Sequence, residues 1–181
     1  MKISETKLKG AFLFELEPIE DERGCFYRTF CREELKAIGV EFTVAQCSSS
    51  FNKTPGILRG MCYQTSPAEE TKIVRCTKGA IYDVIIDLCP ESPSYLQHFG
   101  VYLSAKLMNS LLIPKRFAHG FLTMEPETEV QYMMDEFYAP QAQRGIRYDD
   151  PAFGINWPAP VQVIADKDLK WPLFDKASIL K

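Results

Sequence analysis

Hydrophobic and polar positions alternate over much of the chain, a pattern typical of β-strands whose two faces meet different surroundings. The clearest example is a predicted hairpin, with residues 72–76, a turn at Lys78-Gly79 and residues 81–88. Its second arm places apolar side chains on one face and two carboxylates on the other: Tyr82, Val84, Ile86 and Leu88 opposite Asp83 and Asp87.

Further short strands are separated by breaks rich in Pro, Gly or Ser. We predict them at 11–16, 42–46, 57–64, 98–104, 109–113, 118–124 and 129–136. One short helix is predicted at 32–38, where Gly39 ends it. After Pro140 the chain is rich in Pro, Trp and Asp, and we expect it to wrap the strands as turns and short helices. These features predict an all-β sandwich, jelly roll or barrel with short peripheral helices.

The composition fits a single domain that covers residues 1–181. A chain of 181 residues that is 46% hydrophobic and 25% charged can bury a core of its own. Its formal charge of -3 argues against a nucleic-acid partner. The polar amino terminus lacks the apolar run of a signal peptide, and no apolar stretch approaches the roughly 20 residues that cross a bilayer. We therefore expect a soluble, cytoplasmic protein without a membrane partner.

The cysteines and histidines do not form a metal-binding motif. The six cysteines lie far apart without a C-x-x-C pair, which suits neither a structural zinc site nor a disulfide-rich secreted domain. His98 and His119 are the only two histidines, so a three-histidine metal site is impossible. We predict that the protein uses no metal and no other cofactor.

Because side chains alternate between the two faces of a strand, a small group of reactive residues is expected to point into the same interior. A barrel closed over the predicted strands would enclose a pocket that holds the thiol of Cys62, the imidazole of His119 and the phenol of Tyr132. The cations of Arg59 and Lys72 would lie nearby. A guanidinium buried without an anion is costly, so Arg59 in its mostly apolar strand favours an anion-binding role.

Short motifs follow one another along the chain in a fixed order: DERG at 21–24, GILRGMCYQ at 56–64, KIVR at 72–75, GAIYDV at 79–84, IPKRFAHGF at 113–121, FYAP at 137–140, DDPAFGI at 149–155 and DKD at 166–168. Together they resemble the dTDP-4-dehydrorhamnose 3,5-epimerase family over nearly the whole chain. The resemblance implies a cupin-like jelly roll, a homodimer and no metal. It also implies a nucleoside-diphosphate 4-keto-6-deoxy sugar as the ligand.

The same resemblance implies a reaction and the residues that perform it. The family removes a proton beside the C4 ketone and returns one from the other face, at C3 and C5. An imidazole oriented by an aspartate is the base, a lysine lies near the enolate, and a tyrosine returns the proton. The corresponding positions are Cys62, Asp168, Lys72 and Tyr132, so a thiol stands where the family places its base.

A thiol at this position is a weak candidate for the base. A free thiol has a pKa near 8.5, so only a small fraction is ionised at neutral pH. Lys72 and Arg59 would lower the pKa of Cys62, whereas the carboxylate of Asp168 would raise it by like-charge repulsion. His119 is a possible substitute, and it could instead contact the sugar or the phosphate or polarise the carbonyl.

The implied binding site departs from the family pattern in charge and in hydrogen-bonding capacity. Arg28 replaces a glutamate, Ser48 replaces the asparagine of a Gln-x-Asn pair, and Gln141 replaces the glutamate of Ala-Pro-Glu. These changes favour a different nucleotide or sugar. The complete set of predicted substrate-binding residues is Arg23, Arg28, Gln46, Ser48, Arg59, Lys72, His119, Tyr138, Gln141 and Lys167.

Three hypotheses of function follow. The favoured one is an epimerase of a nucleoside-diphosphate 4-keto-6-deoxy sugar that acts at C3, at C5 or at both. The second is a related cupin enzyme, such as a 3,4-ketoisomerase, in which His119 or Tyr132 handles the proton. The third is a binder of nucleotide sugars without catalysis.

Overall fold

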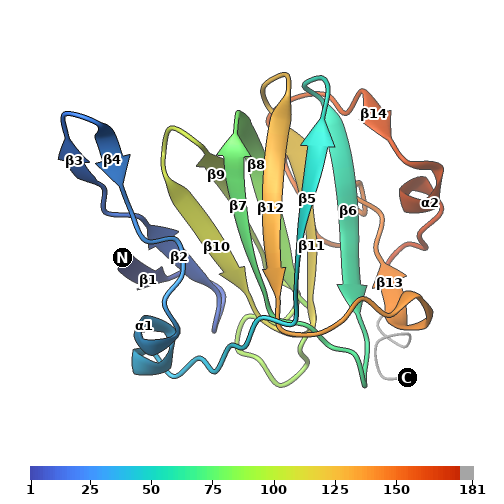
Figure 1. Ribbon diagram of the computed structural model, residues 1–181. Coiled ribbons are helices and arrows are strands. Elements are labelled where there is room, and N and C mark those ends of the chain that lie inside the picture. The colour runs from blue at the N-terminus through green and yellow to red at the C-terminus, as the bar shows by residue number, and fades with distance from the viewer. Residues whose placement is uncertain (176–181) are drawn as a thin grey trace.

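The computed structural model describes residues 1–175, and its strands form two facing sheets (Figure 1). In spatial order, six-stranded sheet I contains β1 (Lys2–Glu5), β2 (Phe12–Glu15), β10 (Asn109–Ile113), β7 (Lys72–Lys78), β12 (Thr128–Met134) and β5 (Gln46–Asn52). Sheet II contains β13 (Gln143–Gly145), β6 (Ile57–Gln64), β11 (Phe117–Thr123), β8 (Ala80–Asp87) and β9 (His98–Ser104), and β14 (Val163–Ile164) pairs with β6. The prediction of an all-β fold is confirmed.

The main core lies between the two sheets, because alternate side chains of each sheet point toward the other. Val74 and Val130 of sheet I belong to the same buried cluster as Ile85 and Phe121 of sheet II. Full burial of such a side chain contributes roughly 1.5–3 kcal/mol. In β8 both faces are buried, with Ile81 and Ile85 in this core and Val84 and Ile86 on the outer face of the sheet.

The outer face of sheet I is covered by a short helix. Leu35 of α1 (Arg32–Ala37) packs against Phe14 and Ile73. Gly39 follows the helix with a φ of +80°, a left-handed conformation that glycine adopts without a steric penalty. The predicted helix at 32–38 and its end at Gly39 are confirmed.

The outer face of sheet II is covered by the tail that follows β12. Phe153 of the tail packs in one cluster with Met61 and Val84 of the sheet. The same tail carries η1 (Pro140–Ala142) and α2 (Asp166–Leu169), which confirms the prediction of turns and short helices. No helix within residues 1–175 is long and apolar enough to cross a membrane.

A two-stranded arm near the amino terminus projects from the body of the molecule (Figure 1). It consists of β3 (Ile19–Asp21) and β4 (Gly24–Phe26), which pair only with each other among the described residues. The side chain of Phe26 is 73% exposed. The arm therefore gains little from packing against its own body.

One predicted strand was placed wrongly, and the reason is informative. Residues 42–46 were expected to form a strand, but the strand is β5, which begins at Gln46. β5 reads Gln-Cys-Ser-Ser-Ser-Phe-Asn, and its residues Phe51 and Asn52 line the pocket described below. A strand whose one large apolar side chain is Phe51 shows no hydrophobic alternation along its length. The 72–88 hairpin, by contrast, is confirmed as β7 and β8, joined at Gly79.

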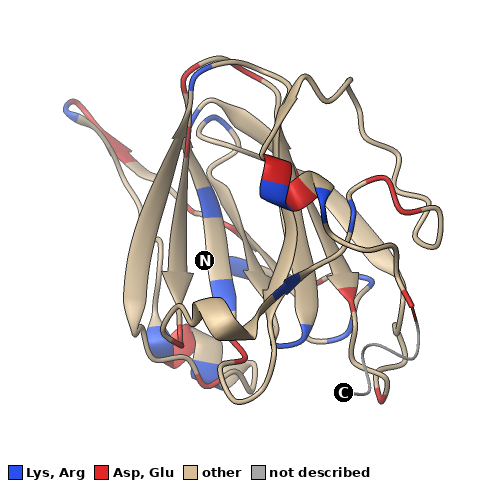
Figure 2. Cartoon of the chain, turned by 90° about the vertical axis from the view of Figure 1, so that its right-hand side faces the viewer, with Lys and Arg blue, Asp and Glu red and all other residues tan. Residues whose placement is uncertain are grey.

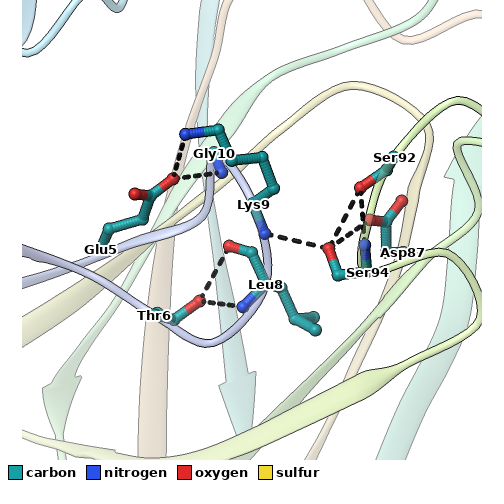
Figure 3. Close-up of polar contacts among 8 residues, drawn as sticks. All are labelled: Glu5, Thr6, Leu8, Lys9, Gly10, Asp87, Ser92 and Ser94. Carbon is teal, nitrogen blue, oxygen red and sulfur yellow. Dashed lines mark hydrogen bonds and ion pairs between the residues drawn. The ribbon is translucent and has the colours of Figure 1, made fainter.

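A polar network ties the loop before β2 to the end of β8 (Figure 3). The backbone N–H of Lys9 donates to Ser94 Oγ at 3.0 Å, and Ser94 Oγ donates to Asp87 Oδ2 at 2.7 Å. Asp87 Oδ1 accepts a bond from the backbone N–H of Cys89. Asp87 is thus occupied by structural bonds, unlike Asp83 on the same face of β8.

Candidate active site

A pocket of about 640 Å³ lies beside the edge strand β5 of sheet I and the strand β6 of sheet II. Residues of β11, β12, β14 and α2 complete its wall. Figure 2 faces the side of β14 and α2 and shows acidic and basic positions together on α2. The pocket brings together six of the predicted site residues: Arg59, Cys62, His119, Tyr132, Lys167 and Asp168.

The reactive side chains of the pocket come from opposite sheets. Cys62 on β6 and His119 on β11 are directly paired positions of sheet II. Tyr132 lies on β12 of sheet I. A flat ligand held between the sheets would therefore present one face to Cys62 and His119 and the other face to Tyr132.

Asp168 of α2 lies beside the thiol of Cys62. The carboxylate is buried, and its Oδ1 is 3.7 Å from Cys62 Sγ. It also accepts bonds from the backbone N–H of Gly60 and from the indole N–H of Trp171, each at 3.3 Å. The Trp171 ring lies against Gly145, where a Cβ would come within 2.3 Å of the ring. The tail is thereby fixed so that it holds a carboxylate against the sulfur.

This environment keeps Cys62 protonated. Burial, followed by the charge of Asp168, raises the pKa of the Cys62 thiol to about 12. The ammonium groups of Lys167 and Lys72 lower that pKa, but they do not offset the two larger effects. At neutral pH the thiolate fraction is accordingly negligible.

His119 forms a second pair with a carboxylate that the sequence reasoning had not assigned to the site. Its Nε2 is 2.8 Å from Asp83 Oδ1, and both residues are buried. Asp83 points inward from β8 because it lies on the face that carries Ile81 and Ile85. Its other oxygen, Oδ2, is buried without a hydrogen-bond partner among the described residues.

Tyr132 is also protonated at neutral pH. Burial raises the pKa of the phenol to about 12, and the nearby Asp83 adds to this rise. The hydroxyls of Tyr132 and Ser50 are 3.2 Å apart, and this hydrogen bond lowers the pKa by less than burial raises it. Tyr132 is therefore available as a proton donor rather than as a base.

Arg59 departs from the expectation that it is buried within its strand, because it is exposed at the pocket. Strand parity alone would place it on the outer face with Met61. The pairing of β6 with β11 shifts register between Cys62 and Arg59, so both residues line the pocket although they are three positions apart. The Nε of Arg59 donates to Asn52 Oδ1 at 2.8 Å, which orients the guanidinium.

A family model described as dTDP-4-dehydrorhamnose 3,5-epimerase matches residues 5–176 of the chain. The chain belongs to this epimerase family. Relatives of that name include one from Shigella flexneri, which is 36% identical over 177 residues and covers 96% of each chain. Another, from Methanothermobacter thermautotrophicus, is 38% identical over 170 residues and covers 92% of this chain and 91% of the relative.

Solved structures of epimerases share the fold. The Bacillus anthracis dTDP-4-dehydrorhamnose 3,5-epimerase with TDP and PPi bound has a TM-score of 0.92 and 38% identity, covering 96% of this chain and 99% of that one. The Legionella pneumophila enzyme in complex with dTDP-4-keto-L-rhamnose has a TM-score of 0.90 and 31% identity, covering 98% and 96%. The predicted family and the cupin-like jelly roll are both confirmed.

Lys72, which the epimerase resemblance placed near the enolate, is already paired. It is buried, and its Nζ is 2.5 Å from Glu70 Oε1. It does not line the pocket, although its charge is close enough to lower the pKa of Cys62. Its predicted role stays a prediction.

The two predicted arginines of the amino-terminal region lie outside the pocket. Arg23 is in the turn of the β3–β4 arm, where it pairs with Asp21 and its side chain is 89% exposed. Arg28 pairs with Glu34 of α1. One chain alone therefore does not bring either guanidinium to Cys62.

The remaining predicted binding residues lie near the other end of β5. Gln46 Oε1 accepts a bond from the backbone N–H of Tyr138, and the Tyr138 hydroxyl donates to Gln143 Oε1. Tyr138 is thus an exposed aromatic ring held at two points. Ser48 is paired with Tyr132 across the strands, and Gln141 is exposed in η1.

The residues that sequence reasoning missed are Asp83, Ser50, Asn52 and Trp171. Asp83 had a usable signal, since a carboxylate on the same strand face as Ile81 and Ile85 must find a partner inside the barrel. Ser50 and Asn52 belong to the polar strand that showed no hydrophobic pattern. Trp171 gave no signal, because its contact with Asp168 depends on the path of the tail.

Proposed function

We propose that this protein epimerises a nucleoside-diphosphate 4-keto-6-deoxy sugar at a carbon next to the C4 ketone, in deoxysugar biosynthesis. One observation carries the proposal: proton-handling groups face the pocket from both sheets, with His119 of sheet II on one side and Tyr132 of sheet I on the other. Epimerisation removes a proton from one face of the sugar and returns one to the opposite face. Membership of the epimerase family supports the same reaction.

The ketone makes this chemistry accessible to side chains alone. A hydrogen next to a carbonyl is acidified, because its removal gives an enolate whose charge lies on oxygen. Cationic groups at the pocket, Arg59 and Lys167, can stabilise anionic oxygens of the enolate or of the diphosphate. Within residues 1–175 no three His, Cys, Asp or Glu side chains gather to hold a metal ion, and the absence of a metal from the reaction stays a prediction.

A nucleoside diphosphate fits the surroundings of the pocket. Relatives have been solved with TDP and with a dTDP sugar bound. In this chain the Tyr138 ring, held by Gln46 and Gln143, offers a flat surface for a nucleobase. Arg59, held by Asn52, offers a guanidinium for a phosphate between base and sugar.

A homodimer would complete the site. Arg23 is predicted to bind the ligand, yet it lies on an arm that projects away from its own pocket with Phe26 exposed. We propose that the arm reaches the pocket of a second copy of the chain. Mixing an Arg23→Ala variant with a His119→Asn variant tests this, since only an arm that acts on the partner would give mixed dimers one intact site. Activity that is not restored after subunit exchange contradicts the arm-swapped dimer.

Solvent isotope exchange tests the proposed reaction directly. The protein is incubated in D₂O with 4-keto-6-deoxyglucose linked to dTDP, CDP or GDP, and deuterium at C3 and C5 is followed by NMR. We expect exchange at one or both carbons and an epimerised product. Exchange with a product whose ketone has moved to C3 would identify a 3,4-ketoisomerase. Tight binding without any exchange would identify a non-catalytic binder. We further expect the activity to be cytoplasmic.

A further inference from the structure

We propose that the imidazole of His119, oriented by Asp83, is the base that removes the sugar proton, and that the thiol of Cys62 does not take this part. The inference rests on the proposed epimerase function and identifies the residue that removes the proton in that reaction. Asp83 acts as a positioning residue, since it contacts the imidazole rather than the sugar.

The geometry of the pair leaves one ring nitrogen free for the reaction. Asp83 Oδ1 engages Nε2 of His119 at 2.8 Å. Nδ1 makes no hydrogen bond within the described chain, and it is not among the fully enclosed polar atoms that lack a partner. A neutral ring that donates Nε2–H to the carboxylate therefore keeps its lone pair on Nδ1, and His119 lines the pocket.

The carboxylate is also placed to stabilise the proton once the ring has taken it. Asp83 is fully buried, and within residues 1–175 its side chain has His119 as its hydrogen-bonding partner while Oδ2 has none. A buried negative charge with so little compensation favours a positive charge beside it. Proton transfer to His119 thus creates an ion pair out of a buried charge.

Proton removal by Cys62 would have the opposite consequence. Its sulfur is 3.7 Å from Asp168 Oδ1, so a thiolate would place two negative charges side by side in a buried setting. The backbone of Gly60 and the indole of Trp171 donate to Asp168. The Trp171 indole also lowers the pKa of the Cys62 thiol, but by less than burial and the charge of Asp168 raise it. The thiol therefore keeps its proton and donates it toward Asp168.

The charged and titratable groups around His119 come from several elements. They are Asp83 of β8, Arg59 and Cys62 of β6, Tyr132 of β12, and Lys167 and Asp168 of α2. The thiol and the phenol each have a pKa of about 12 and keep their protons in the neutral range. Neither group can therefore account for a change in the rate of exchange near neutral pH.

The proposed step is balanced. The proton of the C–H bond next to the ketone goes to Nδ1 of His119, and the C–H electron pair forms the carbon–carbon double bond of the enolate. As the double bond returns its electrons to carbon, the Tyr132 hydroxyl delivers a proton to the opposite face. The imidazolium then releases its proton to solvent, and the phenolate regains one, so no oxidant or co-reactant is consumed.

Three variants test the assignment by deuterium exchange in the full-length protein. His119→Asn should slow exchange by about 100-fold or more, the lower range for loss of a general base. His98→Asn is the matched control, since the other histidine lies on β9 away from the pocket and its loss should leave exchange unchanged. Cys62→Ser should slow exchange by a few-fold at most. Collapse of exchange in Cys62→Ser, or a near-normal rate in His119→Asn, overturns the assignment.

The pH profile keeps the test decisive even if His119→Asn fails to fold. The parent and Cys62→Ser should show the same dependence of exchange on pH, because the thiol takes no part in removing the proton. Asp83→Asn should change that dependence, because the ring no longer gains a carboxylate partner when it accepts the proton. A profile that changes in Cys62→Ser, or one that stays the same in Asp83→Asn, overturns the assignment. A parent protein that exchanges no sugar hydrogen would instead refute the proposed function itself.

Discussion

His119 and Cys62 occupy paired strand positions on sheet II, and each lies beside a buried carboxylate, Asp83 for His119 and Asp168 for Cys62. The carboxylate acts on them in opposite directions. Protonated imidazole is positive, so a carboxylate stabilises the form that results from accepting a proton. Deprotonated thiol is negative, so the same neighbour destabilises the form that could accept one. A neighbouring carboxylate therefore favours the imidazole as a base and disfavours the thiol in that role.

The two pairs also differ in what holds the carboxylate. Asp83 belongs to the central part of sheet II, where β8 pairs with β9 and β11. Asp168 belongs to a short helix of the tail and depends on contacts with Gly60 and Trp171. A change in the tail should therefore alter the Cys62–Asp168 pair while the His119–Asp83 pair persists.

The largest effect is expected from Tyr132, which faces both pairs across the pocket. Tyr132→Phe should reduce formation of epimerised product by about 100-fold or more, because the proton donor of sheet I is lost. Product NMR measures the rate, and calorimetry with dTDP checks that the nucleotide still binds. Tyr102→Phe is the control, since Tyr102 is partly exposed on β9. A Tyr132→Phe variant with the parent rate would show that another group returns the proton.

Replacement of Cys62 by histidine should give the next largest effect, because it would create a second imidazole–carboxylate pair. In Cys62→His, Asp168 would accept a ring N–H instead of opposing a thiolate. We expect exchange to rise by about tenfold, less than the roughly 100-fold or more that a general base supplies, because His119 already serves as one. A loss of activity in this variant would mean that the thiol has a specialised role.

The electrostatic part of the comparison can be measured on the thiol alone. Asp168→Asn removes the like charge, so the pKa of Cys62 should fall below its value of about 12. It should remain above the ordinary thiol value, because burial is the larger cause. Thiolate absorbance followed against pH, relative to Cys62→Ser, gives the change. Asp166→Asn on the same helix is the matched control and should leave the titration in place.

The smallest effect on exchange is expected from Gly145 and Trp171, which hold the tail near Asp168. Their contribution is measured as a change in stability. Gly145→Ala would place a methyl group within 2.3 Å of the Trp171 ring and should lower the free energy of unfolding by about 1–3 kcal/mol. Trp171→Phe keeps a ring over Gly145 but removes the bond to Asp168, which should cost about 1 kcal/mol. Denaturant unfolding measures both values. Equal stability of Gly145→Ala and the parent would show that the tail repacks freely.

Some parts of the fold and the site followed from local patterns. The alternation in 72–88 predicted both arms of the hairpin and the grouping of Asp83 apart from Val84 and Ile86, and the structure confirms these features. The ordered motifs predicted the family. They also predicted that Cys62, His119, Tyr132 and Asp168 would share one pocket.

Other parts depended on register and on distant contacts. Arg59 was predicted near the pocket and lines it, but period-two parity does not explain this position, because the pairing of β6 with β11 shifts register between Arg59 and Cys62. Lys72 was expected near the enolate, but Glu70 two residues away pairs with it. The strand predicted at 42–46 was misplaced, because β5 carries mostly polar side chains, Ser50 and Asn52 among them.

The sequence by itself determined the strand pattern, the family and the substitution of a thiol for an imidazole at position 62, because these are properties of residue order. Only the tertiary structure decided that Asp83 meets His119 while Asp168 meets Cys62. Those contacts join positions 36 and 106 residues apart. Proton affinities are set by such neighbours and by burial, and both exist only once the two sheets and the tail have closed around the pocket.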